Sequence, residues 1–305
     1  MCCLCCHEGG GHLYIRDKYN GKGVNWDEIL SLKKKFIEDN KKGIIHSECV
    51  GCFNLVKRDW DDSEQYISWI HFNHWTHCNS NCIYCYTASD KPSYQKKSHY
   101  KVLPMIKELF KRKMYKPDGV ISFAGGEPTI LNEFEELVTF VLKNNPRLIL
   151  VHSSGIKYSK AIERGIKEQK LIVCLSPDAG TKETYYKVKG VDKFNKFWEN
   201  VKKYSNAQKN IEDKIYVRTK FIIIPGVNDN KYEIDKWLEK NIELGIKTIV
   251  VDIENHFCSD LRLKNLSKPQ HLIELCKYII NRAKELDLNL IHYDNYTYFA
   301  SDIDL

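Results

Sequence analysis

Short runs of hydrophobic, mostly β-branched residues alternate with amphipathic segments from about residue 68 onward. Each run has the length of a buried strand, and each amphipathic segment places its apolar residues at helical spacing. The predicted strands span 68–72, 119–124, 148–153, 171–176, 215–224 and 247–254. The predicted helices span 102–112, 133–145, 159–169, 194–206 and 231–245. This succession of six βα units indicates a parallel sheet with right-handed crossovers.

The pattern predicts an α/β fold, a partial TIM barrel of the (β/α)6 type. Because the run is two units short of a complete eight-stranded barrel, we expect an open, curled sheet. Residues 289–293 offer a seventh strand at its edge. In such folds the loops after the carboxyl ends of the strands build the active site, so polar residues at these ends are the candidates for chemistry.

The first 65 residues lack this rhythm and hold six cysteines, a glycine run and one helical pattern. Asn25 is the expected N-cap of that helix and Gly43 its C-terminal stop. We therefore expect two domains: a cysteine-rich metal-binding appendage at 1–65, and the barrel with a C-terminal extension at 66–305. The appendage is too short to build a large core unaided, which is where bound metals help.

The composition, with 43% hydrophobic and 29% charged residues, is typical of a soluble globular enzyme. No apolar run reaches the roughly 20 residues that cross a bilayer, and no export signal opens the chain. We therefore expect a cytoplasmic protein without a membrane partner, whose clustered cysteines bind metal rather than form disulfides. Cys174, Cys258 and Cys276 stand alone and are expected to be small buried residues.

The formal net charge of +7 is mild. Lysine-rich, solvated helix faces explain it better than an anionic substrate or RNA does. The sequence has no basic stripe interleaved with aromatic residues and no nucleic-acid-binding motif, so a nucleic-acid partner is not expected.

The stretch HWTHCNSNCIYCYT, residues 74–87, places Cys78, Cys82 and Cys85 in one closely spaced group. It directly follows the first predicted strand, at the carboxyl end of the barrel. The residues 79–81, Asn-Ser-Asn, favour a turn over a buried helical stripe. Thiolates are the usual ligands of iron–sulfur clusters, and three of them on a four-iron cluster leave one iron without a protein ligand.

These cysteines, with the aromatic Tyr84 before the last one, resemble the signature of the radical S-adenosylmethionine (radical SAM) superfamily. The second predicted strand runs into Gly125-Gly126-Glu127-Pro128, which is similar to the GGE motif of that superfamily. The resemblance covers residues 68 to about 254.

The resemblance implies a 4Fe-4S cluster held by the three cysteines, which act as metal ligands and catalytic residues. S-adenosylmethionine would chelate the open iron, and an electron from a donor such as flavodoxin or ferredoxin would split it. The resulting 5′-deoxyadenosyl radical would abstract hydrogen from an organic substrate, such as a small molecule, sugar or peptide. In such enzymes the cofactor carries the difficult chemistry, and the protein supplies placement and exclusion of water.

The same resemblance assigns part of the cofactor pocket to the glycine motif. Gly125 and Gly126 have no side chain to block the methionine moiety, and their carbonyls and Glu127 are candidate acceptors for its ammonium group. Pro128 completes the motif. Ser154 ends the third predicted strand, where the family often has a small polar residue near the cofactor.

Further pocket candidates end the fourth and fifth predicted strands. Ser176 and Asp178 follow the fourth; Asp178 suits ribose hydroxyls or, alternatively, the N-cap of a following helix. Arg218 and Lys220 point to one face of the fifth strand. One of them would bind the methionine carboxylate; the competing explanation is an internal ion pair with Asp252 or Glu254. Asn228 and Asp229 are weaker candidates near adenine.

The appendage offers two Cys-x2-Cys pairs, Cys2/Cys5 or Cys3/Cys6 with Cys49/Cys52. Such pairs suit zinc or an auxiliary iron–sulfur cluster, and unmetallated thiols are the third alternative. The segment faintly resembles the SPASM-type auxiliary-cluster extensions of the superfamily, although these usually follow the barrel. An auxiliary cluster would favour an oxidation or an epimerisation.

Two alternatives to a radical SAM enzyme acting on such a substrate remain open. One is an RNA-modifying enzyme that uses the same radical. The other is a non-catalytic iron–sulfur or zinc scaffold. The complete cysteine triad and glycine motif speak against the scaffold, because a scaffold has no need of an open iron.

Overall fold

A seven-stranded parallel sheet with the strand order β3-β4-β5-β6-β7-β8-β9 organises the protein. The computed structural model describes residues 25–45, 66–73, 75–85 and 101–301, and the backbone alone of 2–3 and 14–15. The sheet strands are β3 (Ile67–Phe72), β4 (Tyr115–Phe123), β5 (Leu148–Ser153), β6 (Leu171–Leu175), β7 (Val217–Ile223), β8 (Thr248–Ile253) and β9 (Asn289–His292). The short strands β1 (Cys2–Cys3) and β2 (Tyr14–Ile15) pair antiparallel.

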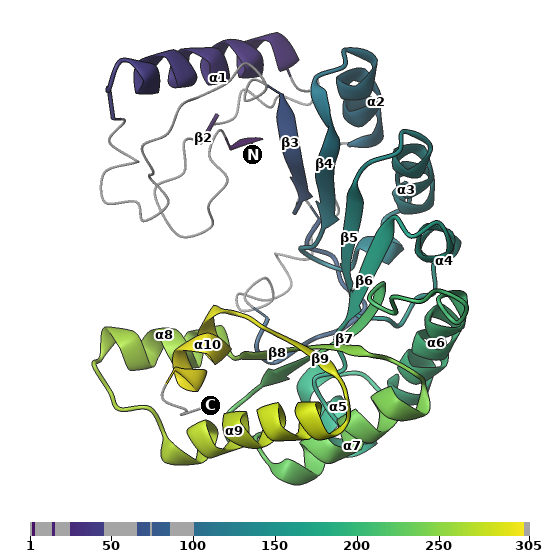
Figure 1. The fold of residues 1–305 in the computed structure, drawn as a ribbon, viewed down its shortest axis with the longest axis vertical. Coiled ribbons are helices and arrows are strands. Elements are labelled where there is room, and N and C mark those ends of the chain that lie inside the picture. Colours follow the sequence, from purple (N-terminus) through teal and green to yellow (C-terminus); the bar gives the residue numbers. More distant parts are fainter. Residues whose placement is uncertain are drawn as a thin grey trace.

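Helices cover the outer side of the curled sheet (Figure 1). The helices are α1 (Trp26–Lys41), α2 (Leu103–Lys111), α3 (Phe134–Lys143), α4 (Lys160–Lys167), α5 (Lys182–Lys189), α6 (Phe194–Ala207), α7 (Lys231–Glu243), α8 (Asn255–Leu263), α9 (Gln270–Glu285) and α10 (Asp294–Ala300), with the 3-10 turn η3 (Pro128–Ile130). The predicted α/β partial barrel is thereby confirmed, and β9 is the seventh strand at its edge.

The two faces of the sheet differ in chemistry. Along β7, Val217, Thr219, Phe221 and Ile223 are fully buried against the outer helices, whereas the alternate residues are partly exposed on the concave side. Strand β5 repeats this alternation. The outer face therefore supplies much of the hydrophobic core, and the less buried inner face carries both apolar and charged side chains.

One strand boundary and several helices differ from the prediction. Strand β4 starts at Tyr115, four residues early, because Pro117 and Gly119 are poor strand formers and hid its beginning. Helix α5 was foreseen only in the alternative that made Asp178 an N-cap, because its sequence KETYYKVK carries few apolar residues at helical spacing. The helices α8, α9 and α10 in the C-terminal extension were also left unassigned.

Helix α1 begins and ends as expected. The Asn25 side chain accepts a hydrogen bond from the backbone N–H of Glu28 at 3.2 Å, and Gly43 has a left-handed backbone with φ +77°. Trp26 at its start belongs to the same hydrophobic core as the barrel. The domain boundary at residue 65 stays a prediction, because residues 46–65 lie outside the described part.

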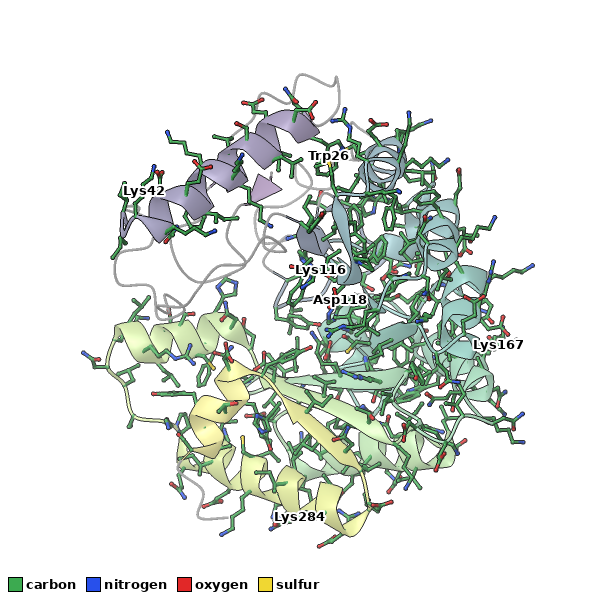
Figure 2. All side chains as sticks on the ribbon, turned by 45° about the horizontal axis from the view of Figure 1, so that its top comes forward. Trp26, Lys42, Lys116, Asp118, Lys167 and Lys284 are labelled. Carbon is green, nitrogen blue, oxygen red and sulfur yellow. The ribbon has the colours of Figure 1, made fainter. Side chains whose placement is uncertain are left out.

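Charged side chains such as Lys167 and Lys284 project from the outer helices into solvent (Figure 2). Many of them pair with a carboxylate one helical turn away, as Lys167 does with Glu163 at 2.7 Å. Exposed pairs of this kind contribute little to stability. Among the described helices, none combines the length and apolar character needed to cross a lipid bilayer.

Helix α5 is attached to α7 through the buried carboxylate of Glu233. This side chain accepts hydrogen bonds from the N–H groups of Gly180 (2.7 Å) and Thr181 (3.1 Å), and from the hydroxyls of Thr181 (2.7 Å) and Thr184 (2.8 Å). Its negative charge also sits at the positive end of the α5 dipole. Glu233 therefore sets the position at which α5 begins.

We expect the substitution Glu233→Ala to lower the free energy of unfolding by about 3 kcal/mol, because it leaves several buried donors without an acceptor. Urea denaturation measures this change. The matched control is Glu212→Ala at an exposed site, for which we expect a change within about 0.5 kcal/mol. Equal effects of the two substitutions would contradict the anchoring role.

Candidate active site

The three cysteines of the signature lie on one loop, residues 75–85, that follows the carboxyl end of β3; we call it the cysteine loop. Cys78, Cys82 and Cys85 are free thiols and partly buried. The described loop contains turns and no helix, with the N–H of Cys85 donating to the carbonyl of Cys82 at 3.1 Å. The expectation of a turn at this place is confirmed.

Main-chain hydrogen bonds join the cysteine loop to the glycine motif at the end of β4. The N–H of Gly126 donates to the carbonyl of Trp75, and the N–H of Glu127 donates to the carbonyl of His77 at 2.9 Å. The strands β3 and β4 are neighbours in the sheet, so their carboxyl ends meet at one edge. The two motifs therefore form one continuous structure.

The glycines of the motif are required by this close approach. A Cβ atom on Gly125, whose φ is +90°, would lie 2.5 Å from Oδ1 of Asn73 and 2.7 Å from the carbonyl oxygen of Trp75. A Cβ atom on Gly126 would lie 2.3 Å from the carbonyl oxygen of His77. Since these contacts are too short for any side chain, the glycines first serve the packing of the cysteine loop.

The carboxylate of Glu127 connects the ends of β4 and β5. It is 1% exposed and accepts hydrogen bonds from Thr129 N–H (3.0 Å), Thr129 hydroxyl (2.5 Å), Ser153 hydroxyl (2.8 Å) and Ser154 N–H (2.5 Å). The Ser154 hydroxyl in turn donates to Oδ1 of Asn79 in the cysteine loop at 2.8 Å. Glu127 and Ser154 thus join the ends of β4 and β5 to the cysteine loop. The contact of Glu127 with an ammonium group, and the place of Ser154 near the cofactor, stay predictions.

A buried group of three side chains, Tyr84, Asp178 and Lys189, holds the other flank of the cysteine loop; we call it the Lys189 network. The Tyr84 hydroxyl donates to Oδ2 of Asp178 at 2.5 Å, and Lys189 Nζ donates to the same oxygen and, at 3.0 Å, to the Tyr84 hydroxyl. Oδ1 of Asp178 accepts from the N–H of Ile222 on β7 at 2.8 Å. The network therefore connects the loop, the end of β6, helix α5 and strand β7.

The backbone of the cysteine loop also completes the C-terminal end of α5. The last carbonyls of a helix lack partners within the helix. Here the N–H of Asn81 donates to the backbone carbonyl of Lys189 at 2.8 Å, and the N–H of Ile83 donates to that of Val188 at 3.0 Å. Gly190 ends the helix in the left-handed conformation, and a Cβ atom there would lie 2.9 Å from the carbonyl oxygen of Asn81.

The electrostatics of the network favour an ionised Lys189 beside a neutral Tyr84. Burial and the neighbouring Asp178 carboxylate raise the pKa of Tyr84 well above its ordinary value. For Lys189, burial opposes the charge, but Asp178 outweighs it and the pKa is raised. Burial, then the carboxylate of Glu127, raises the pKa of the Cys78 thiol to about 12. Binding of a metal cluster to such thiols releases protons.

The donor set of the cysteine loop fits an iron–sulfur cluster, because cysteine thiolates are the usual ligands of such clusters. Buried polar atoms next to the cysteines, Nδ1 of His77 and Oγ of Ser80, have no hydrogen-bond partner in the described part, as suits a site that receives a polar ligand.

The surroundings of Arg218 and Lys220 bear on the two roles left open for them. Among the described residues, neither cation has a carboxylate within ion-pair distance; Nε of Arg218 donates to the Ile215 carbonyl at 3.1 Å. Asp252 accepts from two backbone N–H groups, at 2.9 and 3.3 Å, and lies near enough to Lys220 for their charges to interact. Glu254 caps α8.

The capping alternative for Asp178 is wrong, because Thr181 caps α5. The Asp178 carboxylate has no exposed surface and is held by protein donors, which favours a positioning role over contact with a ribose. Ser176 is partly exposed, with no hydrogen bond from its side chain among the described residues. Asn228 is buried, and its side chain donates to the backbone carbonyls of Asp178 and Ile222 at 2.8 Å. It therefore joins the segment after β6 to the end of β7, which favours a structural role over contact with adenine.

Two site residues escaped the sequence prediction, Asn79 and Lys189. Asn79 was interpreted only as a turn residue. The signal for Lys189 was the Lys-Gly ending of α5, which marks a helix stop, but its partner Tyr84 is 105 residues away in the chain. The auxiliary candidates Cys5, Cys49 and Cys52 lie outside the described residues, and for Cys2 the structure describes the backbone alone, so an auxiliary metal stays a prediction.

We expect Lys189→Met to lower the free energy of unfolding by about 3–5 kcal/mol, because it leaves the buried Asp178 carboxylate without its cation. Asp178 has a left-handed backbone, with φ +50°, which asparagine tolerates. The double variant Asp178→Asn/Lys189→Met removes both charges, so we expect it to lose less free energy of unfolding than Lys189→Met alone. Denaturant unfolding compares them, with the exposed Lys187→Met as the control. If the double variant lost as much free energy of unfolding as Asp178→Asn and Lys189→Met lose together, the ion pair would be excluded as the cause.

Comparison with known proteins gives one family. The model of the Radical SAM superfamily matches residues 72–238, more than half of the chain. A GTP 3′,8-cyclase of Vibrio atlanticus (strain LGP32) is 25% identical over 128 residues, which cover 41% of this chain and 38% of that protein.

Solved structures with similar folds include SuiB of Streptococcus suis bound to S-adenosylmethionine, with a TM-score of 0.61 and 14% identity over 94% of this chain and 60% of SuiB. The anSMEcpe protein with bound AdoMet has a TM-score of 0.52 and 18% identity over 73% of this chain and 63% of its own. The chain thus spans less than two thirds of each of these proteins. With the cysteine triad and the glycine motif in place at the carboxyl edge of the sheet, the chain belongs to the radical SAM superfamily.

Proposed function

We propose that the protein is an enzyme that binds a 4Fe-4S cluster through Cys78, Cys82 and Cys85 and uses S-adenosylmethionine to start radical chemistry on an organic substrate. One observation carries this proposal: the three cysteines lie on a loop at the carboxyl edge of the sheet, hydrogen-bonded to the glycine motif of the next strand. When bound, the cluster and S-adenosylmethionine together supply a carbon-centred radical that abstracts hydrogen.

The side chains around the cysteines have separate tasks in this proposal. The turn at Gly125 and Gly126 offers its backbone to the methionine moiety. Lys220 lies nearer the carboxyl edge of β7 than Arg218 and makes no direct ion pair among the described residues, so we assign it to the methionine carboxylate. Ser176 is the proposed partner of the ribose. Asp178 acts indirectly, because it holds Tyr84 and with it the cysteine loop.

The reaction class and the substrate are further parts of the proposal. An oxidation or an epimerisation is favoured if the appendage holds an auxiliary cluster, since such a cluster can accept or relay an electron. Relatives point to two substrate classes: SuiB and anSMEcpe have been solved with peptides, and the sequence relative is a GTP 3′,8-cyclase by name. A small redox protein such as flavodoxin or ferredoxin is the proposed electron donor.

We expect the anaerobically reconstituted protein to release 5′-deoxyadenosine when it is reduced with dithionite in the presence of S-adenosylmethionine. The variant Cys78→Ala should lose the release and the change that S-adenosylmethionine makes in the electron paramagnetic resonance spectrum, because the cluster has lost a ligand. Chromatography of the nucleoside and the spectrum are the two measurements.

The matched control is Cys276→Ala, which removes a buried thiol on α9 outside the cysteine loop. We expect this variant to retain both signals. Release by Cys78→Ala at the level of the unmodified protein, or no release by the unmodified protein, would overturn the proposed function.

A further inference from the structure

The concave face of the sheet carries Arg218, a cation that no described carboxylate pairs with. On β7 the partly exposed positions are Arg218, Lys220 and Ile222, which alternate with fully buried ones. The register pairs His152 of β5 with Cys174 of β6, and Cys174 with Arg218 of β7. His152 and Arg218 therefore stand at one level on the inner side of the curl, two strands apart.

Arg218 has an incomplete set of partners. Its Nε atom donates to the carbonyl of Ile215 at 3.1 Å, and its two terminal nitrogens have no hydrogen bond among the described residues. Burial lowers the pKa of Arg218, with no carboxylate to offset the effect. A half-buried cation without a counter-charge is costly to a folded protein unless a ligand provides one.

The carboxylates near this face are committed elsewhere. Oδ1 of Asp252 accepts two backbone hydrogen bonds, and the charge that acts on this carboxylate is that of Lys220 rather than Arg218. Asp118, near the amino end of β4, lies 4.0 Å from the ammonium group of Lys116 (Figure 2). Among the described residues, no carboxylate is therefore paired with Arg218.

Polar groups without charge complete the same face. Burial, then the nearby Lys220, lowers the pKa of His152 to about 4, so its imidazole is neutral at pH 7 and has both a donor and an acceptor nitrogen. On β4, the Ser122 hydroxyl bonds the ring nitrogens of Trp69 at 3.0 Å and His71 at 2.6 Å. A ligand on this face would therefore contact the donor nitrogen of His152 near the cationic Arg218.

We propose that Arg218, together with His152, binds an oxyanion group of the substrate, a carboxylate or a phosphate, on the concave face of the sheet. The inference rests on the proposed function, because it places the substrate beside the cofactor edge. A guanidinium presents two parallel N–H groups to such an anion. Arg218 lies two residues below Lys220, about 7 Å further from the carboxyl edge, so the substrate anion and the methionine carboxylate occupy separate positions.

The test is a calorimetric titration of the full-length, anaerobically reconstituted protein, saturated with S-adenosylmethionine so that the open iron is occupied. Inorganic pyrophosphate is the probe in one arm and succinate in the other, at fixed ionic strength. We expect one anion per chain. Arg218→Gln should weaken its binding at least tenfold, and Arg218→Lys should weaken it less, because the charge remains but the fork is lost. Arg147→Gln, at an exposed arginine before β5, is the matched control and should bind as the unmodified protein does.

Binding of pyrophosphate alone assigns a phosphate substrate, binding of succinate alone a carboxylate, and binding of both supports recognition of oxyanions in general. No binding in either arm, or the same loss in Arg147→Gln, would overturn the proposal. A parallel measurement of S-adenosylmethionine affinity separates the two anion sites: if Arg218→Gln loses the cofactor as strongly as the probe, Arg218 belongs to the cofactor pocket. Failure to release 5′-deoxyadenosine with anion binding intact would contradict the proposed function and leave this site standing.

Discussion

The buried contact between Lys189 and Asp178 is the interaction on which the candidate site depends. Taking two charges out of water is costly, so the pair persists only because both partners are present and the Tyr84 hydroxyl and the backbone of β7 complete their hydrogen bonds. The role of the ion pair is to position the cysteine loop. The cysteine loop has no regular secondary structure in its described part, and the pair holds it against the end of α5. That helix is in turn fixed by Glu233 of α7, so the position of the three thiols is set by elements distant in sequence.

The curled sheet separates two requirements that compete in many folds. Residues on the outer face of β5 and β7 are buried and mostly apolar, and they pack against the helices. The inner face is only partly buried, and there Arg218, Lys220 and His152 lie beside apolar residues. A closed barrel would bury such side chains among one another. The open curl leaves them beside solvent and beside the edge that carries the cysteine loop, where a substrate can neutralise them.

The strand pattern and the two motifs were readable from the sequence because each depends on neighbouring residues. Short runs of hydrophobic, mostly β-branched residues identified the strands, and the spacing of the cysteines with the glycines after the next strand indicated the family. Helix α5 and the role of Lys189 were not readable, because they depend on partners far away in the chain. Asp178 illustrates the limit: a carboxylate after a strand suits several roles, and only the packing of Tyr84 and Lys189 against it selects one.

The main-chain bonds between the cysteine loop and the glycine motif have a thermodynamic consequence. They are made entirely between atoms of the protein, so the backbone entropy of these segments is lost when the chain folds. A cofactor that arrives afterwards meets a pre-organised surface and does not bear that ordering cost again. More of its contact energy then appears as affinity, and a substitution that loosens this junction weakens binding even when every ligating sulfur remains.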